Sequence, residues 1–227
     1  MKPLHSVVHV SVLTVLFSFA LGAQVQCPSV SVSDTRPSLS ILQAQIDALT
    51  LRVHQVENPT PKKVFVTSQT FSGDLGGLDG ADAICDQAAG AAGLSGTYRA
   101  WLGDDSEGPN QRFTRSGPYA LLDGTIIAFG WDGLTDGTLL APINLDEFGQ
   151  LVPSPGVAWT NVEVEGNRMS PDPSLPDADS HCDNWTYEAV DHVGRGGRSD
   201  TTLGPWTATR SSFVACISQL RLYCFEQ

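Results

Sequence analysis

Hydrophobic residues early in the chain recur at the spacing of a coiled coil. Intervals of 3, 4, 3, 4 and 3 separate Leu39, Leu42, Ile46, Leu49, Val53 and Val56. This pattern predicts a short coiled-coil helix over residues 38–57, capped by Ser38 and ended by a proline linker at residues 58–61. With under three heptads it is too short to be stable alone, so we expect it to join two or three copies of the chain. The alternative is an amphipathic helix packed on its own domain.

The rest of the chain, residues 62–227, has the pattern of one α+β domain. Short apolar runs predict strands at 64–67 and 98–102, and a terminal hairpin from 213–217 and 220–225. A helix is predicted between Gly80 and Gly93, because small apolar residues fall on one face and Gly93 can end it. Residues 103–180 are rich in Gly, Pro, Asp and Asn, which predicts loops around short strands.

The first residues have the pattern of a secretory signal. Lys2 precedes an apolar stretch from Val7 to Leu21, and small residues at Ala20 and Gly22 suit a cleavage site. We therefore expect a signal peptide at 1–23 and a linker at 24–37 that contains Cys27. An uncleaved membrane anchor is the alternative, but the run is short and no stop-transfer charges follow. The expected location is extracellular, at the cell surface or periplasmic, without membrane insertion once the signal is removed.

Composition narrows the classes of partner. Thirteen Lys and Arg stand against 25 Asp and Glu, for a net charge of −12. This argues against nucleic acid and anionic lipid as partners, since both attract basic surfaces. With 41% hydrophobic residues the chain can bury a core, and 22 Gly and 14 Pro indicate many turns.

Five cysteines carry the clearest covalent signal. Export permits disulfides, and the four cysteines of the domain allow three pairings. Cys85 in the predicted helix and Cys224 in the last strand suggest a bridge that ties the ends of the domain together, leaving Cys182 to pair with Cys216. Each bridge would contribute roughly 4–5 kcal/mol on the chain-entropy model. Cys27 is the odd cysteine, and we expect it to form an interchain disulfide.

Motifs for catalysis are not apparent in the sequence. The glycines at 73–80 lack the spacing of a phosphate-binding loop, and neither GxSxG nor HExxH occurs. We therefore nominate no catalytic or cofactor-binding residue and expect a non-enzymatic protein, with a hydrolase of unknown type as the least favoured alternative. Asp172, Asp177 and Asp179 form a candidate calcium loop; the alternative is a solvated acidic loop.

One further motif bears on modification. Asn184-Trp185-Thr186 is a glycosylation sequon that matters only in a host that glycosylates secreted proteins. We expect Trp185 to lie in the core rather than on a ligand platform.

Several segments resemble the endostatin domain of collagens XV and XVIII. Residues 76–85 (GGLDGADAIC) and 93–102 (GLSGTYRAWL) are similar to its GxxGADxxC helix and GLxGTFRAFL strand. Similar segments follow in the same order at 158–159, 166–168, 182–186, 212–216 and 222–226. Residues 120–125 and 139–144 look closer to an uncharacterised domain of leptospiral and other bacterial surface proteins. The resemblance covers about residues 62–227.

The resemblance implies a C-type-lectin-like fold with nested bridges Cys85–Cys224 and Cys182–Cys216, used as a secreted binding module. Some family properties do not carry over. Endostatin is basic and binds heparin through arginines, whereas this chain is acidic, and the histidines of its zinc site have no counterpart near the domain start. The acidic and Asn residues of a calcium-dependent sugar site are missing from 207–215.

These observations together predict a homo-oligomer, dimer or trimer, whose heads present residues 103–180 to an unknown protein or glycan ligand. A structural surface or matrix protein without a small ligand is the alternative. No cofactor other than the candidate calcium ion is expected.

Overall fold

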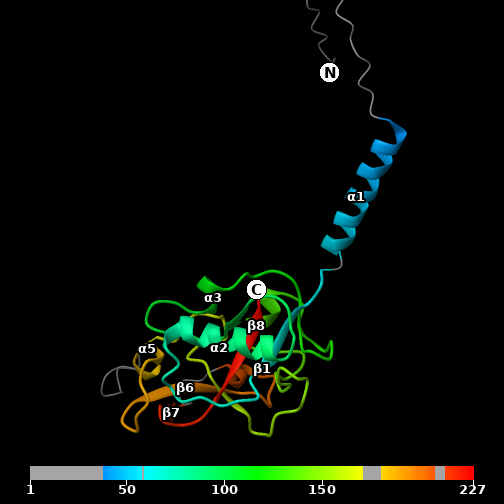
Figure 1. Ribbon diagram of the computed structural model, residues 1–227. Helices are drawn as coiled ribbons and strands as arrows, with labels where there is room; N and C mark the ends of the chain where they lie inside the picture. Colours follow the sequence, from blue (N-terminus) through cyan, green and yellow to red (C-terminus); the bar gives the residue numbers. More distant parts are fainter. Residues whose placement is uncertain (1–37, 58, 171–179, 208–212) are drawn as a thin grey trace, which may run out of the picture. The chain divides into compact units, whose positions relative to one another are not determined.

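A computed structural model describes residues 38–57, 59–170, 180–207 and 213–227, with the backbone alone for residues 47 and 50–57 (Figure 1). The predicted signal peptide and Cys27 lie outside these ranges. Contacts between residues divide the chain into two units, residues 1–47 and 48–227, which we describe separately.

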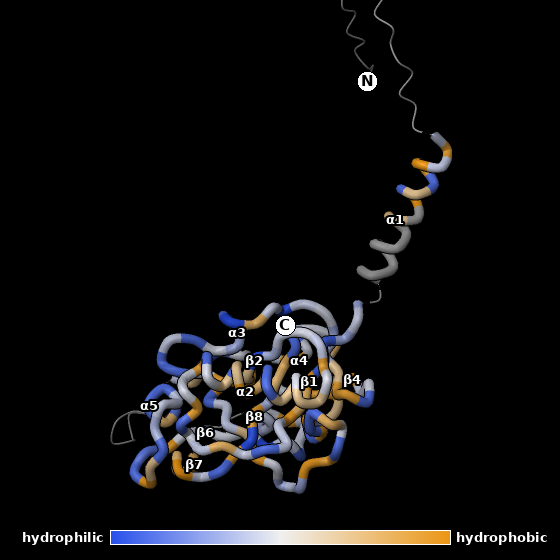
Figure 2. Tube along the Cα trace, viewed as in Figure 1, coloured by the Kyte–Doolittle hydropathy of each residue, from blue (hydrophilic) through white to orange (hydrophobic). Residues whose placement is uncertain are grey.

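The predicted helix near the start of the chain is confirmed as α1, Leu39–Glu57. The carbonyl of Ser38 accepts hydrogen bonds from the N–H groups of Ile41 (2.9 Å) and Leu42 (3.1 Å), which begins the helix there. Leu39, Leu42 and Leu49 of the predicted stripe are exposed, and hydrophobic and polar residues follow one another along the first part of α1 in Figure 2. None of the described helices has the length and apolar character needed to cross a bilayer. Assembly of α1 with other copies stays a prediction.

The head is a mixed α+β domain built on a sheet of eight strands. The strands are β1 (Lys62–Val66), β2 (Tyr98–Ala100), β3 (Tyr119–Ala120), β4 (Ile126–Ala128), β5 (Val157–Trp159), β6 (Val193–Arg198), β7 (Phe213–Ala215) and β8 (Arg221–Glu226). The order is β4-β3-β1-β8-β5-β6-β7, and β2 also pairs with β8. Strand β8 is antiparallel to β1 and β2 and parallel to β5.

Helices and a 3-10 turn surround this sheet. They are α2 (Gly77–Ala91), α3 (Pro109–Arg112), α4 (Trp131–Leu134), α5 (Cys182–Trp185) and η1 (Gly204–Trp206). Between residues 103 and 170 the described chain consists of short strands and single helical turns joined by loops, as the sequence predicted. Helix α2 lies across β8 in Figure 1.

Strand β8 is buried on both faces, so it separates two apolar clusters. Leu222 and Cys224 point to the cluster beneath α2, whereas Tyr223 and Phe225 point to the other. In the second cluster Trp101 lies at the centre of an aromatic group: its ring centroid is 5.0 Å from that of Trp206 and 5.4 Å from that of Phe225. The alternation follows from the two-residue period of a strand.

Helix α2 confirms the predicted helix, with its start moved from Gly80 to Gly77. At its end Gly93 has a positive φ of 69°, and its N–H bonds to the carbonyl of Gly90 (3.1 Å). The next N–H, of Leu94, bonds to the carbonyl of Ala89 (2.9 Å). These two bonds form a Schellman motif, which needs a left-handed residue where Gly93 stands.

The predicted terminal hairpin is wrong. Both segments form strands, but β7 pairs with β6, and the neighbours of β8 are β1, β2 and β5. Both edges of β8 are occupied by strands from earlier in the chain. The continuous apolar run in β8 fits this central position, because a strand covered on both faces needs apolar side chains on both.

Candidate functional site

Both disulfides have the suggested pairing. Cys85 of α2 is bonded to Cys224 of β8, with Cα atoms 5.4 Å apart, and Cys182 of α5 is bonded to Cys216, with Cα atoms 5.6 Å apart. All four sulfurs lie in the cluster beneath α2. The Cys85–Cys224 bridge therefore joins an early helix to the last strand, and the loop segment 103–180 lies between Cys85 and Cys182 in the sequence.

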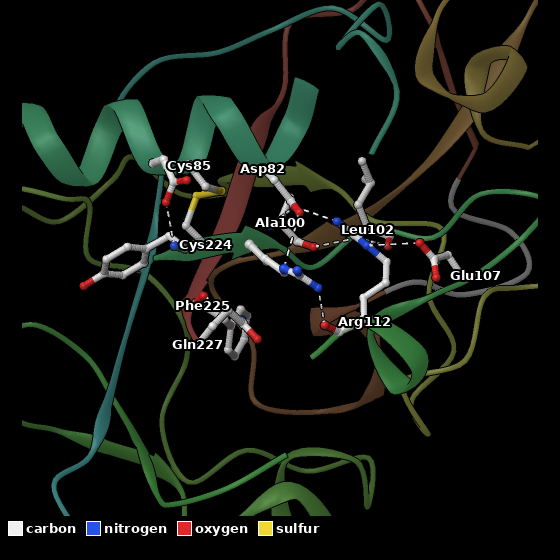
Figure 3. Close-up of polar contacts among 12 residues, drawn as sticks. Asp82, Cys85, Ala100, Leu102, Glu107, Arg112, Cys224, Phe225 and Gln227 are labelled. Atoms are coloured by element: carbon white, nitrogen blue, oxygen red, sulfur yellow. Dashed lines mark hydrogen bonds and ion pairs between the residues drawn. A yellow bond between two sulfur atoms is a disulfide. The ribbon is translucent and has the colours of Figure 1, made fainter. Parts of the chain in front are cut away.

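A polar network attaches helix α2 to the free edge of β2 (Figure 3). Asp82 Oδ1 accepts a hydrogen bond from the N–H of Ala100 (2.9 Å), and Asp86 Oδ1 accepts one from the N–H of Tyr98 (2.6 Å). The two carboxylates are one turn apart on α2, and the two N–H groups belong to residues two apart on β2, so both point to the same edge of the strand. Side chains of α2 therefore serve backbone donors that would otherwise lack a strand partner.

Arg112 extends this network to the first loop after β2. Its side chain is only 4% exposed, and the guanidinium donates from Nη2 to Asp82 Oδ1 (2.6 Å) and from Nη1 to the carbonyl of Leu102 (3.1 Å). Its Nε lies 3.8 Å from Glu107 Oε1. Because these donors are directed at the protein's own groups, the arrangement holds the loop in place.

A second network joins the loop after β2 to the turn that contains Cys182. His181 Nδ1 accepts a hydrogen bond from the N–H of Asn184 (2.9 Å), so its Nε2 carries the proton and donates to Asp105 Oδ1 (3.0 Å). Burial acts to raise the pKa of Asp104, but hydrogen bonds donated by Glu107 and Ser106 outweigh it and lower that pKa.

The backbone of α5 is left-handed. Cys182, Asp183, Asn184 and Trp185 have φ values of 51°, 51°, 54° and 63°. The left-handed conformation costs a residue other than glycine about 1–2 kcal/mol. Such strain persists only where surrounding contacts enforce it, here the disulfide at Cys182 and the hydrogen bond from Trp185 Nε1 to the carbonyl of Gly103 (2.9 Å).

The structure describes the residues of the sequon but not those of the candidate calcium loop. Trp185 is fully buried, as predicted, and Asn184 Oδ1 accepts a hydrogen bond from the N–H of Asp105 (3.0 Å). Asp172, Asp177 and Asp179 lie outside the described residues, so the calcium site stays a prediction. Within the described ranges no group of three or more His, Cys, Asp and Glu residues could hold a metal ion.

Burial in the core raises the pKa of two tyrosines. It raises the pKa of Tyr119 to about 12 and that of Tyr98 well above its usual value. Thr207 is fully buried; its Oγ1 accepts from Trp101 Nε1 (2.8 Å) and donates to the carbonyl of Val162 (2.8 Å). These groups support the core.

Large apolar side chains are exposed on the loop segment. Phe129, Phe148 and Leu151 are 77%, 55% and 73% exposed. A shallow depression of about 410 Å³ lies beside Phe129 and Trp131, and the guanidinium carbon of Arg115 is 5.8 Å from the centroid of the Trp131 ring. Two further depressions flank Phe148. This loop surface is the candidate binding site.

Sequence reasoning nominated the loop segment but missed these particular residues. The spacing of Asp82 and Asp86 was a usable signal, because residues four apart share a helix face. Phe129 and Phe148 gave no such signal, since single hydrophobic residues in a loop are as compatible with burial as with exposure.

The described head is thus a disulfide-bonded α+β domain with an apolar loop surface. A search of known protein-family models found no match to the chain.

Proposed function

We propose that this chain is a secreted or surface-displayed binding protein without enzymatic activity. A short coiled coil and Cys27 gather two or three copies, and each C-type-lectin-like head offers its loop segment 103–180 to a protein or glycan ligand. The observation that carries the proposal is the exposure of Phe129, Phe148 and Leu151 on the loop segment. The turn at Phe148 is held by the buried carboxylate of Asp146, which accepts hydrogen bonds from the N–H groups of Phe148 (2.9 Å) and Gln150 (2.9 Å). Apolar side chains displayed on a rigid scaffold are typical of interaction surfaces.

The location outside the cytosol is supported by the disulfides and the signal-like start. Disulfides persist in oxidising compartments and are rare in the cytosol. The lectin-like fold is supported by the sequence resemblance and by the nested bridges Cys85–Cys224 and Cys182–Cys216. An oligomer adds function because linked heads raise the effective concentration of weak sites without new contacts.

The test is binding of the exported protein to arrays of glycans and extracellular proteins. We expect at least one ligand to be retained, and the double variant Phe129→Ser/Leu151→Ser to lose roughly 90% of that signal, about 1.4 kcal/mol of binding free energy. The matched control is Val190→Ser, which removes a side chain that is 74% exposed outside the loop segment. If no ligand is retained and the heads associate only with each other in sedimentation, a structural surface protein replaces this proposal.

A further inference from the structure

A cavity of about 280 Å³ opens beside the C-terminal half of α2. Ile84 and Ala88 of α2 form one wall, and Phe71 and Phe148 contribute apolar surface from two loops. These α2 residues are partly exposed, because the helix buries Leu78, Ala81, Cys85 and Ala89 against the sheet and leaves the adjacent stripe uncovered. The walls can therefore accept an aliphatic chain.

Glu147 supplies the charge in this cavity. The residue is 5% exposed, and its carboxylate accepts hydrogen bonds from the N–H of Ser68 (2.7 Å) and from the Ser68 hydroxyl. Both donors are neutral, and no ion pair within the described part of the chain includes Glu147. The guanidinium of Arg221 donates instead to the carbonyls of Thr67 and Ser68. Because the Glu147 carboxylate has no direct ion pair among the described residues, an ammonium entering the cavity would be attracted to it.

A second depression of about 370 Å³ shares Glu147 and Phe148 with this cavity. Leu94, Leu122 and Asp123 line this second part. We call the two depressions together the α2 groove. Among its described lining residues the charged ones, Asp123 and Glu147, are both acidic. Charge complementarity therefore selects a cationic occupant, and Phe148 and Leu122 offer apolar surface to its neighbours.

Lysine fits these features better than arginine. A lysine side chain has a four-carbon stem that packs on apolar walls and ends in a compact ammonium with three donors. Arginine favours bidentate pairing with both oxygens of one carboxylate, and each oxygen of Glu147 already accepts a bond from Ser68.

We propose that the α2 groove binds a lysine side chain of a protein partner, with the ammonium at Glu147 and the partner's neighbouring apolar residues against Phe148 and Leu122. This rests on the proposed function, because it names a site and a ligand class for the same loop surface. No redox or covalent step is involved.

The test uses the full exported chain, labelled with nitrogen-15, and two peptides followed by NMR. The first is acetyl-Leu-Ala-Lys-Ala-Leu-amide; the second has norleucine for lysine and so keeps the stem without the ammonium. We expect saturable shifts of the Ser68, Gln87 and Ala91 amides with the lysine peptide and at least about tenfold weaker binding of the norleucine peptide. Equal binding of the two peptides overturns the proposal.

Variants separate the charge from the fold. Glu147→Gln keeps a similar shape and should weaken binding of the lysine peptide about tenfold, whereas Glu165→Gln, an exposed carboxylate outside the groove, should leave it unchanged. Ala91→Trp fills the cavity from an exposed position on α2 and should abolish the shifts without touching the buried carboxylate. Unchanged binding by Glu147→Gln or Ala91→Trp, each with the wild-type melting temperature, contradicts a lysine site.

The array experiment distinguishes this failure from that of the broader proposal. Ligands captured equally by the wild type and Ala91→Trp remove the lysine site but leave the binding module in place. Ligands captured by the wild type and lost in Ala91→Trp support the groove as the site.

Discussion

At the scale of single residues, the head depends on buried polar groups that bind its own backbone. Arg112 is the clearest case, since one guanidinium joins the carboxylate of Asp82 to the carbonyl of Leu102. Asp82 would keep Arg99, whose Nε lies 3.7 Å from its Oδ2, so the main cost of removing Arg112 is the unpaired carbonyl of Leu102 and a weakened ion pair.

We therefore expect Arg112→Met to lower the free energy of unfolding by about 2–3 kcal/mol. The measurement is denaturant unfolding followed by tryptophan fluorescence, with the disulfides intact. Arg115→Met is the matched control: Arg115 is exposed and its Nη1 bonds to the side chain of Asn110 (2.8 Å), so its loss should cost at most about 1 kcal/mol. Equal effects of the two substitutions would show that the buried network adds little.

Sequence could not identify these roles at the residue scale. Arg112 and Glu147 stand among turn-forming residues, where a charged side chain is normally solvated. Their burial follows from the path of loops that are far apart in sequence, such as Ser68 beside Glu147. The cysteines were more informative, because a helix position and a last-strand position limited which pairs could meet.

At the scale of elements, the positions of helices and strands were predicted well, but the pairing of strands was not. The helix at α2 and the strands at β1, β2 and β8 follow from periodicity within a few residues. The pairing of β7 with β6 depends on which strand edges remain open, and a local pattern carries no information on that. The left-handed turn α5 was likewise not predicted. Asp183-Asn184 tolerates this conformation better than most dipeptides, but the signal is common to ordinary turns.

The left-handed turn yields a prediction about glycine. Asp183→Ala and Asp183→Gly remove the same side chain, so their difference reports on the backbone alone. With φ at 51°, we expect the glycine variant to be more stable by roughly 0.5–1 kcal/mol, because relief of about 1–2 kcal/mol of strain exceeds the entropy that glycine adds to the unfolded chain.

An exposed position in a right-handed helix provides the control for this comparison. Ala83 lies on α2, and Ala83→Gly should destabilise the head by about 0.5–1 kcal/mol. The preference for glycine over alanine should therefore change sign between positions 183 and 83 in denaturant unfolding. The same sign at both positions would mean that α5 is not left-handed in solution.

At the scale of the whole molecule, the proposed binding function would depend on how many heads are joined. The head contains two disulfides, whereas the predicted coiled coil has under three heptads and would be weak by itself. An interchain bond at Cys27 would compensate for this, because it converts assembly of the coil into an intramolecular step with a high effective concentration. Covalent and noncovalent contacts are then both needed for a stable oligomer.

This division of roles predicts different results for two variants in sedimentation equilibrium. Cys27→Ser should run as a monomer on non-reducing gels and dissociate on dilution, yet form dimers or trimers of the 24.2 kDa chain (before signal removal) at high concentration. Cys27→Ser with Leu42→Asp should stay monomeric at every concentration, since it places a charge on the exposed stripe of α1. The control, Cys27→Ser with Ala44→Asp, puts the same charge on the opposite side of the helix and should behave as Cys27→Ser alone. If Leu42→Asp and Ala44→Asp give equal masses, the stripe does not join the chains, and avidity would have to arise from the heads themselves.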